Sequence, residues 1–460
     1  MVREISASGH PPLYYFIEHF FLQINQSGIW VRMMPVLCGV LAVWLIFLTG
    51  RELFSRRAGI LAATFAALSP FLIWHSADAT DYTLLITISL ASFYFLIRSV
   101  NRGGRIDWAL YFVFTALGFY SHYYFTFMFL AEIPAYLVLR HRDRSVKPWL
   151  IVQAGLILSA TPYLFFFDHG ASQWVALTSP DLKALGSVLV GGCLVLLGGY
   201  RKNSDGAAAP IILSVKRMLF YCLILYLPLA IVTWKTIARR KFFNRKHLAL
   251  SLVFAILSLG PALAQLIDNS FVGGRFLTMA AAPLIIMIGA ILSTQSTKIM
   301  ILAATSVAIG LLGLNLVQQT QTFHHDWRGL MSVISANAQR NDKILCFPLH
   351  HCLMAEDYYL GQPLSTFGGE IAGNQVFIEK AVQGYADMTF SSQPSNASEL
   401  GAWLNENLSG AKRMWLVGGT GILGYYTRTT PIEKLLPKQW HLVYERQFDV
   451  LVVKLFERAD

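Results

Sequence analysis

Two carboxylates lie close together in a short polar segment between two apolar runs. The segment, residues 74–82, reads WHSADATDY and contains no lysine or arginine. Asp78 and Asp81 are three residues apart, so the pair has the spacing to share a proton, to bind a divalent ion, or to act as a base and its orienting partner. The alternative is that Asp81 caps the following helix, because the helix dipole favours an acid at that end.

Two histidines stand in similar polar breaks. His10 precedes Pro11 and Pro12 in HPPLYY, and these prolines exclude an earlier helix start and present His10 on an extended turn. His122 lies in SHYY between two apolar runs. A simpler interpretation stands beside each candidate role: His10 is a solvated residue at a helix cap, and His122 is an anchor in an aromatic girdle at the membrane surface.

One arginine has the setting of a phosphate ligand. Arg275 follows paired glycines in FVGGRFL and opens an apolar run. The glycines allow a tight turn, and the guanidinium fork matches a lipid phosphate. Contact with a phospholipid headgroup is the alternative.

The amino-acid composition indicates what kind of fold positions these residues. Of 460 residues, 55% are hydrophobic and 14% charged, and the mean hydropathy of +0.49 is sustained along the chain. Such a chain must expose apolar surface to lipid, which indicates a polytopic membrane protein and excludes disorder, coiled coil and a disulfide scaffold. Of the five cysteines, only Cys346 and Cys352 have the setting to pair. The net charge of +11 comes from basic residues between apolar runs. These residues therefore indicate the orientation of the chain in the membrane and do not indicate a nucleic-acid partner.

Ten apolar runs are long enough to span a bilayer, at about 20 residues each. They lie near 31–50, 58–75, 81–99, 106–121, 123–140, 149–167, 217–236, 247–267, 276–294 and 298–318. An eleventh, glycine-rich run at 182–200 is interpreted as re-entrant or lying along the outer surface, because a crossing there would place later loops on the wrong side.

The distribution of basic residues sets the orientation. Arginines and lysines crowd the loops after the first, third and fifth runs and the segment 235–246, which are therefore cytoplasmic. Arg201, Lys202 and Lys216 lie outside, against this rule. The polar breaks that hold the candidate residues then face outward. So does everything after residue 319.

The last part of the chain changes character. From about 320 to 460 the apolar runs shorten to strand length, as in KILCF, MWLV and VLVVKLF, and alternate with helical patterns such as WRGLMSVISANAQ. We therefore expect a transmembrane domain over 1–319 and a small extracytoplasmic α/β domain over 320–460. The run GTGILG at 419–424 is interpreted as a turn and not as a dinucleotide fingerprint, because Pro431 leaves little room for the required helix.

Several motifs together resemble the bacterial branch of the protein-mannosyltransferase superfamily, which includes the aminoarabinose and galacturonic acid transferases of lipopolysaccharide. They are HPPLYY, the RRAG loop, the hairpin from LSP to DYTL, GFYSHYYF and GGRFLTMAAAPL. The resemblance implies a mainly α, polytopic GT-C fold that moves one sugar from a polyprenyl-phosphate carrier to an acceptor at the outer face, with inversion of the anomeric centre.

The resemblance also implies roles for individual residues. His10, Asp78 and Tyr82 fall on positions in the family's outer loops, and Arg275 falls on an arginine that opens a late helix. Thr80 stands where the family commonly has an arginine. We keep His10, Asp78, Asp81, Tyr82 and His122 as active-site candidates and Arg275 as the candidate ligand of the donor phosphate.

The family's catalytic base is an acidic pair on the first outer loop, tens of residues before the HPP turn. Only Met1 to Gly9 precede His10, and Glu4 is too close to take that place. Either a further span and the base lie upstream of Met1, which the topology favours, or the chain is an inactive relative. We assign no base within these residues. No cofactor is certain, and a divalent metal ion stays open.

The leading hypothesis is a glycosyltransferase of the bacterial inner membrane with a periplasmic C-terminal domain. Its expected partners are a polyprenyl-phosphate-linked sugar donor, a glycan, lipid or protein acceptor and membrane lipids, with no nucleic acid. The alternatives are a transporter or flippase for lipid-linked sugars and a non-catalytic subunit that binds the carrier lipid.

Overall fold

The computed structural model divides the chain into two compact units, Met1–Arg201 with Ala209–Thr320, and Lys202–Ala208 with Gln321–Asp460. The residues that the structure describes are 11–25, 27–166, 200–202, 208–210, 227–238, 244–264, 278–319, 326–339, 342–346, 408, 410–419, 433, 436–448 and 451–459. His10, Arg275 and nearly all of the 182–200 run lie outside them.

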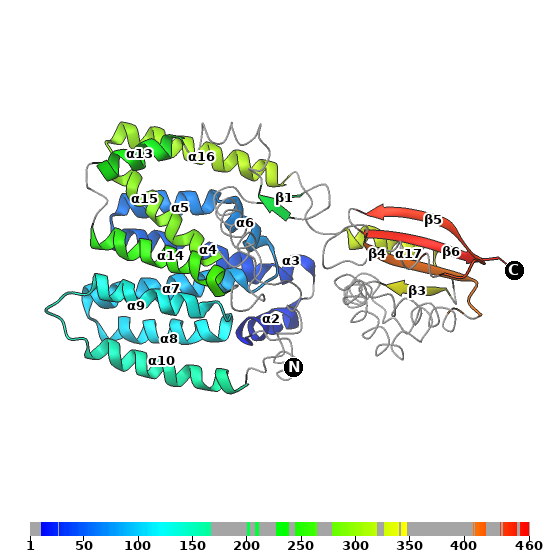
Figure 1. The fold of residues 1–460 in the computed structure, drawn as a ribbon, viewed down its shortest axis with the longest axis horizontal. Coiled ribbons are helices and arrows are strands. Elements are labelled where there is room, and N and C mark those ends of the chain that lie inside the picture. Colours follow the sequence, from blue (N-terminus) through cyan, green and yellow to red (C-terminus); the bar gives the residue numbers. More distant parts are fainter. Residues whose placement is uncertain are drawn as a thin grey trace. The chain divides into compact units, whose positions relative to one another are not determined.

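The first unit is a bundle of helices (Figure 1). Its elements are α2 (Leu13–Ile24), α3 (Gly28–Val31), α4 (Met33–Leu53), α5 (Arg56–Leu68), α6 (Pro70–Ala77), α7 (Tyr82–Arg102), α8 (Arg105–Ser121), α9 (Phe125–Leu139), α10 (Lys147–Phe166), α13 (Leu227–Ala238), α14 (Arg245–Ala264), α15 (Ala281–Ser293) and α16 (Thr297–Gln319). Strands β1 (Tyr200–Lys202) and β2 (Ala208–Pro210) pair in a two-stranded sheet.

Each of the ten apolar runs overlaps one of these helices or, for 58–75, the pair α5 and α6. The helices follow from the lipid environment, where a backbone must satisfy its own hydrogen bonds. Among the described residues, three helical segments are long and apolar enough to cross a membrane: Gly28–Leu53, Tyr82–Arg102 and Thr297–Gln319. The pair α5 and α6, bent by 58°, is a fourth if it counts as one span. The total of ten crossings stays a prediction.

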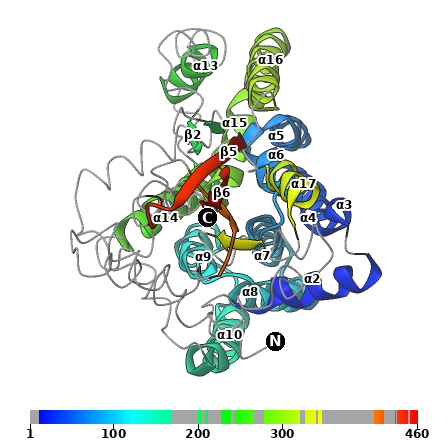
Figure 2. The same ribbon diagram turned by 90° about the vertical axis from the view of Figure 1, so that its right-hand side faces the viewer.

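Helix α7 occupies the middle of the bundle. Helices α4, α8 and α9 pack around it (Figure 2), and 89% of its most apolar stretch is buried. Some of its polar side chains bind neighbouring helices, as where the Thr87 hydroxyl donates to the Cys38 carbonyl of α4 at 2.8 Å. Gly39 on α4 lets α6 approach closely, because a Cβ there would collide with the Ser76 hydroxyl.

The bend between α5 and α6 has a local cause and a distant support. Ser69 ends α5 in an extended conformation, and Pro70 begins α6, so the carbonyls at the end of α5 lose their helical partners. Two amides of α16 bind the break: Asn315 donates to the Leu68 carbonyl, and Gln318 donates to the Pro70 carbonyl at 2.8 Å. Helix α16 therefore holds α6, which ends one residue before Asp78.

Two ion pairs lie at the C-terminal end of α7. Arg102 contacts Glu52 at 2.9 Å, and Arg98 contacts Asp107 at 2.9 Å. Asp81 stands at the first turn of the same helix. The candidate acids and the ion-paired basic residues thus lie at opposite ends of a helix that is long enough to span a bilayer, as the orientation rule expects.

The second unit contains a four-stranded sheet with the order β3-β4-β6-β5. Its elements are α17 (Trp327–Asn337), β3 (Lys343–Cys346), β4 (Arg413–Gly419), β5 (Trp440–Phe448) and β6 (Leu451–Arg458). Strand β3 pairs with β4 in parallel, and the other pairs are antiparallel. The apolar face of α17 covers one side of the sheet around Trp415, whose indole N–H donates to Asp342 at 2.8 Å. The short apolar runs predicted as strands are β3, β4 and β6.

Candidate active site at one end of the helix bundle

The polar breaks between the apolar helices come together where α6, α7, α8 and α9 meet. Asp78 follows α6, Asp81 precedes α7, and His122 stands between the end of α8 and the start of α9. Helix α2 lies at the same end of the bundle (Figure 1). The breaks form because each segment must end one apolar helix and start the next with polar or turn-forming residues.

Asp81 and His122 form the centre of this group. The Oδ2 atom of Asp81 lies 3.9 Å from Nε2 of His122, and the side chains are only 9% and 1% exposed. The backbone N–H of Tyr124 donates to Nδ1 of His122 at 3.0 Å, so Nδ1 is an acceptor and Nε2 carries the proton of the neutral ring. The imidazole therefore points its N–H toward the carboxylate.

Asp81 is the N-cap residue of α7, where the helix-cap interpretation places it. Its backbone carbonyl accepts the first helical bond, from the N–H of Leu85 at 2.9 Å, but its side chain caps no backbone N–H of α7. Burial, followed by the repulsion from Asp78, raises the pKa of Asp81 to about 7. Asp81 therefore titrates near neutral pH, as expected for one of two acids that compete for charge.

Aromatic rings enclose the histidine. The centroid of Tyr82 lies 5.5 Å from that of His122, and Tyr123 and Tyr124 lie at 4.4 and 4.8 Å. Tyr124 is nearly parallel to the imidazole, at 17°. The prediction that His122 sits among aromatic rings is correct, but it is fully buried and not an anchor at the surface.

Helix α2 adds two polar residues that the sequence analysis missed. Tyr14 and Glu18 stand four residues apart, so they share one face of the helix, and both are buried. Among the described residues, neither the Tyr14 hydroxyl nor the two Glu18 carboxylate oxygens have a hydrogen-bond partner. Burial raises the pKa of Tyr14, and the charges of Glu18, Asp81 and Asp78 raise it further. An acid four residues after a tyrosine in the apolar run LYYFIEHFF was the available signal.

The sequence analysis also did not identify His75 as a candidate residue. It is buried on α6 with its ring 4.7 Å from Phe71 and 5.6 Å from Tyr82, while its carbonyl accepts from the Thr83 hydroxyl at 2.6 Å. His75 thus joins α6 to α7 directly behind the candidate residues.

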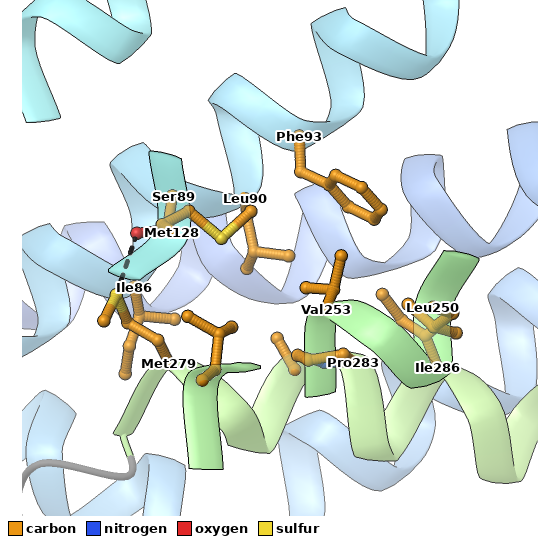
Figure 3. Close-up of a pocket in the computed structure, with 12 residues that line it drawn as sticks. Ile86, Ser89, Leu90, Phe93, Met128, Leu250, Val253, Met279, Pro283 and Ile286 are labelled. Atoms are coloured by element: carbon orange, nitrogen blue, oxygen red, sulfur yellow. Dashed lines mark hydrogen bonds between the residues drawn. The ribbon is translucent and has the colours of Figure 1, made fainter. Parts of the chain in front are cut away.

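Within the described part of the chain, no three residues among His, Cys, Asp and Glu are grouped to hold a metal ion. The one described pocket lies away from the polar group, between α7, α9, α14 and the start of α15 (Figure 3). It is lined by apolar side chains such as Phe93, Met128 and Val253, with a contact of 3.4 Å from Ser89 to Met279. Its lining suits hydrocarbon, so the polar chemistry belongs to the helix ends.

These features define a polytopic helical membrane protein with a polar cluster at one end of its bundle. Residues 9–166 match the family model described as dolichyl-phosphate-mannose-protein mannosyltransferase. No curated protein matches the sequence significantly.

The fold has solved counterparts. The chain is similar to ArnT from Cupriavidus metallidurans in the apo state, with a TM-score of 0.54 and 13% identity over 99% of this chain and 91% of that one. It is also similar to the same protein bound to undecaprenyl phosphate, with a TM-score of 0.52 and 13% identity over 99% and 92% of the two chains. Residues 9–166 are therefore similar to a mannosyltransferase family model, and the chain shares its fold with ArnT.

Proposed function

We propose that the protein transfers a single sugar from a polyprenyl-phosphate donor to an acceptor at the outer face of the bacterial inner membrane. The observation that carries the proposal is the buried Asp81 and His122 pair, surrounded by tyrosines, at the end of a bundle with a GT-C fold. The match over residues 9–166 and the undecaprenyl phosphate bound by ArnT support a donor of this class.

In such a reaction a bond forms between the acceptor oxygen and the anomeric carbon, and the bond from that carbon to the phosphate oxygen breaks. The proton of the acceptor hydroxyl passes to a general base, and the electron pair of the broken bond leaves with the phosphate oxygen, so polyprenyl phosphate departs as an anion. We assign to Asp81 the acceptance of a hydrogen bond from a substrate hydroxyl, with the Nε2–H of His122 stabilising its charge.

Tyr14 and Glu18 extend the proposed site onto α2. Buried polar atoms without partners are costly, about 1–3 kcal/mol each, and persist where a ligand satisfies them. A sugar presents several hydroxyls that both donate and accept, so a phenol and a carboxyl four residues apart suit it. We further propose that His10 lines this site and that Arg275 binds the donor phosphate; both lie outside the described residues.

We propose that the first unit is the catalytic membrane domain, corresponding to residues 1–319, and that 320–460 is periplasmic and contributes to acceptor choice. Attachment of a membrane-impermeant thiol reagent to cysteines introduced at Gln439 and Arg142 tests the orientation. Labelling of intact spheroplasts at position 439 and not at 142 is expected, and the reverse pattern would contradict it.

The activity test uses the full chain in lipid nanodiscs with undecaprenyl-phosphate sugars carrying mannose, aminoarabinose or galacturonic acid. Release of undecaprenyl phosphate is followed with membrane acceptors present and absent. Acceptor-dependent release that is lost in Asp81→Asn and kept in Glu52→Gln, at the far end of the bundle, is expected. Binding without release would indicate a non-catalytic subunit, and movement of intact donor across vesicles would indicate a flippase.

A further inference from the structure

A second polar cluster lies deep in the bundle, where the proposed reaction does not use it. Glu132 on α9 is 1% exposed, and its Oε1 atom lies 2.6 Å from the hydroxyl of Ser92 on α7. The Ser92 hydroxyl lies 2.8 Å from that of Thr115 on α8, and the Thr115 hydroxyl lies 2.7 Å from the carbonyl of Tyr111. These contacts form one line of oxygens from α9 through α7 to α8. The three helices lie side by side in the bundle (Figure 2).

If Glu132 is ionised, the line contains too few hydrogens to place one in each oxygen–oxygen contact. Three short oxygen–oxygen contacts need three hydrogens, but Ser92 and Thr115 supply only one each. If both hydroxyls point toward Glu132, Thr115 faces the Tyr111 carbonyl without a hydrogen at 2.7 Å. If Thr115 donates to that carbonyl and Ser92 to Glu132, the two hydroxyl oxygens face each other at 2.8 Å without one.

We infer that Glu132 holds a proton in the folded protein and is a neutral carboxylic acid. It donates to Ser92, Ser92 donates to Thr115, and Thr115 donates to the carbonyl of Tyr111, so each contact contains one hydrogen. The line then runs in one direction from α9 through α7 to α8.

The second carboxyl oxygen and the surroundings support the same assignment. Among the described residues, Oε2 of Glu132 has no hydrogen-bond partner of normal geometry, and no ion pair involves Glu132. Of the titratable side chains described, only Tyr111 acts on this carboxyl group, through a side-chain hydrogen bond, and no cation does. A buried carboxylate without a cation is far more expensive than the carbonyl of a neutral acid.

A metal cation in place of the proton does not fit the spacing. Oxygens that coordinate a cation at about 2.4 Å stand roughly 3.3 Å or more apart. The contacts from Ser92 to Glu132 and Thr115, at 2.6 and 2.8 Å, are hydrogen-bond lengths and leave no room for an ion between them.

The line of hydrogen bonds joins the helices that carry the candidate site. Ser92, Thr115 and Glu132 belong to the three helices whose ends carry Asp81 and His122. Glu132 is therefore a positioning residue, since its proton fixes how α7, α8 and α9 pack. This inference rests on the described contacts and not on the proposed transfer reaction.

Infrared spectroscopy of the full chain in nanodiscs at pH 7 tests the inference. The difference between wild type and Glu132→Gln is expected to contain the C=O band of a protonated carboxylic acid. The matched control Glu52→Gln, whose carboxylate pairs with Arg102, is expected to remove only carboxylate bands. Loss of carboxylate bands in Glu132→Gln, or an acid band that disappears on addition of sodium or potassium ions, would overturn the inference.

Two further variants test the direction of the line. Ser92→Ala removes the acceptor and is expected to shift the acid band to higher frequency, while an unshifted band would exclude the donation. Glu132→Gln keeps a donor in the same place and is expected to retain the melting temperature and the pH profile of transfer. Glu132→Leu removes the donor and is expected to lower the melting temperature. Equal destabilisation by the glutamine and leucine variants would show that no donor is needed.

Discussion

The imidazole of His122 points its Nε2 atom at the carboxylate of Asp81 across 3.9 Å, while the backbone N–H of Tyr124 holds the opposite ring nitrogen. The two residues come from different helix connections, so their pairing depends on how α7 packs against α8 and α9. A separation of this length is longer than a direct hydrogen bond.

The raised pKa of Asp81 predicts a pH dependence of stability. The pKa rises from 3.8 to about 7 on folding, so the folded state binds the proton more tightly. The stabilisation is complete below pH 4 and is lost as the pH rises through 7, at up to about 1.4 kcal/mol per unit. Relative to wild type, Asp81→Asn should gain stability from pH 4 to 7 and then level off, as measured by thermal melting.

Asp78 supplies part of that shift by repulsion. Asp78→Asn should therefore move the midpoint of the effect to lower pH without removing it. A stability difference for Asp81→Asn that stays constant from pH 4 to 8 would contradict the assigned shift.

Replacement of His122 by glutamine should reduce transfer by roughly 100-fold, at the lower end for groups that assist proton movement. Glutamine cannot both accept from Tyr124 and present a ring N–H to Asp81 in the same geometry. Initial rates in nanodiscs measure the effect. His19→Gln on α2 is the control, because His19 is exposed and its described contacts, a hydrogen bond to Gln23 and the ring of Phe20, lie within α2; equal losses in both variants would remove His122 from the site.

Tyr14→Phe should raise stability while weakening substrate binding. The hydroxyl is buried without a partner among the described residues, so its removal relieves about 1 kcal/mol. Tyr120→Phe is the matched control with the opposite sign, because the Tyr120 hydroxyl donates to the Ser159 carbonyl at 2.8 Å. Thermal melting and titration with undecaprenyl phosphate and donor sugars measure the two effects, and a destabilised Tyr14→Phe would show that the hydroxyl is satisfied.

Gln318→Leu should destabilise the bundle by about 1 kcal/mol, because it removes the hydrogen bond from α16 to the Pro70 carbonyl at the bend. Gln319→Leu changes the next residue of the same helix, which is exposed, and should have little effect. Thermal melting of the two variants gives the comparison. Similar melting temperatures would mean that the bend does not depend on α16.

Much of this architecture follows from the sequence. Long apolar runs become helices because lipid offers no partner for backbone polar groups, so the helices appear wherever such runs were predicted. Asp78, Asp81, Tyr82 and His122 were identifiable because polar residues in apolar surroundings are costly and gather where helices end. The strands β3, β4 and β6 were likewise visible as short apolar runs.

The tertiary structure decided which polar residues meet. Helices that are apolar on all sides carry little periodic signal for the face that turns inward, so the sequence did not indicate that Asp81 faces His122, that Tyr14 and Glu18 are buried, or that Asn315 supports the bend. Likewise, Ser92, Thr115 and Glu132 are isolated polar residues in three separate runs. Only the packing of α7, α8 and α9 places them within hydrogen-bond distance and makes the number of hydrogens between them countable.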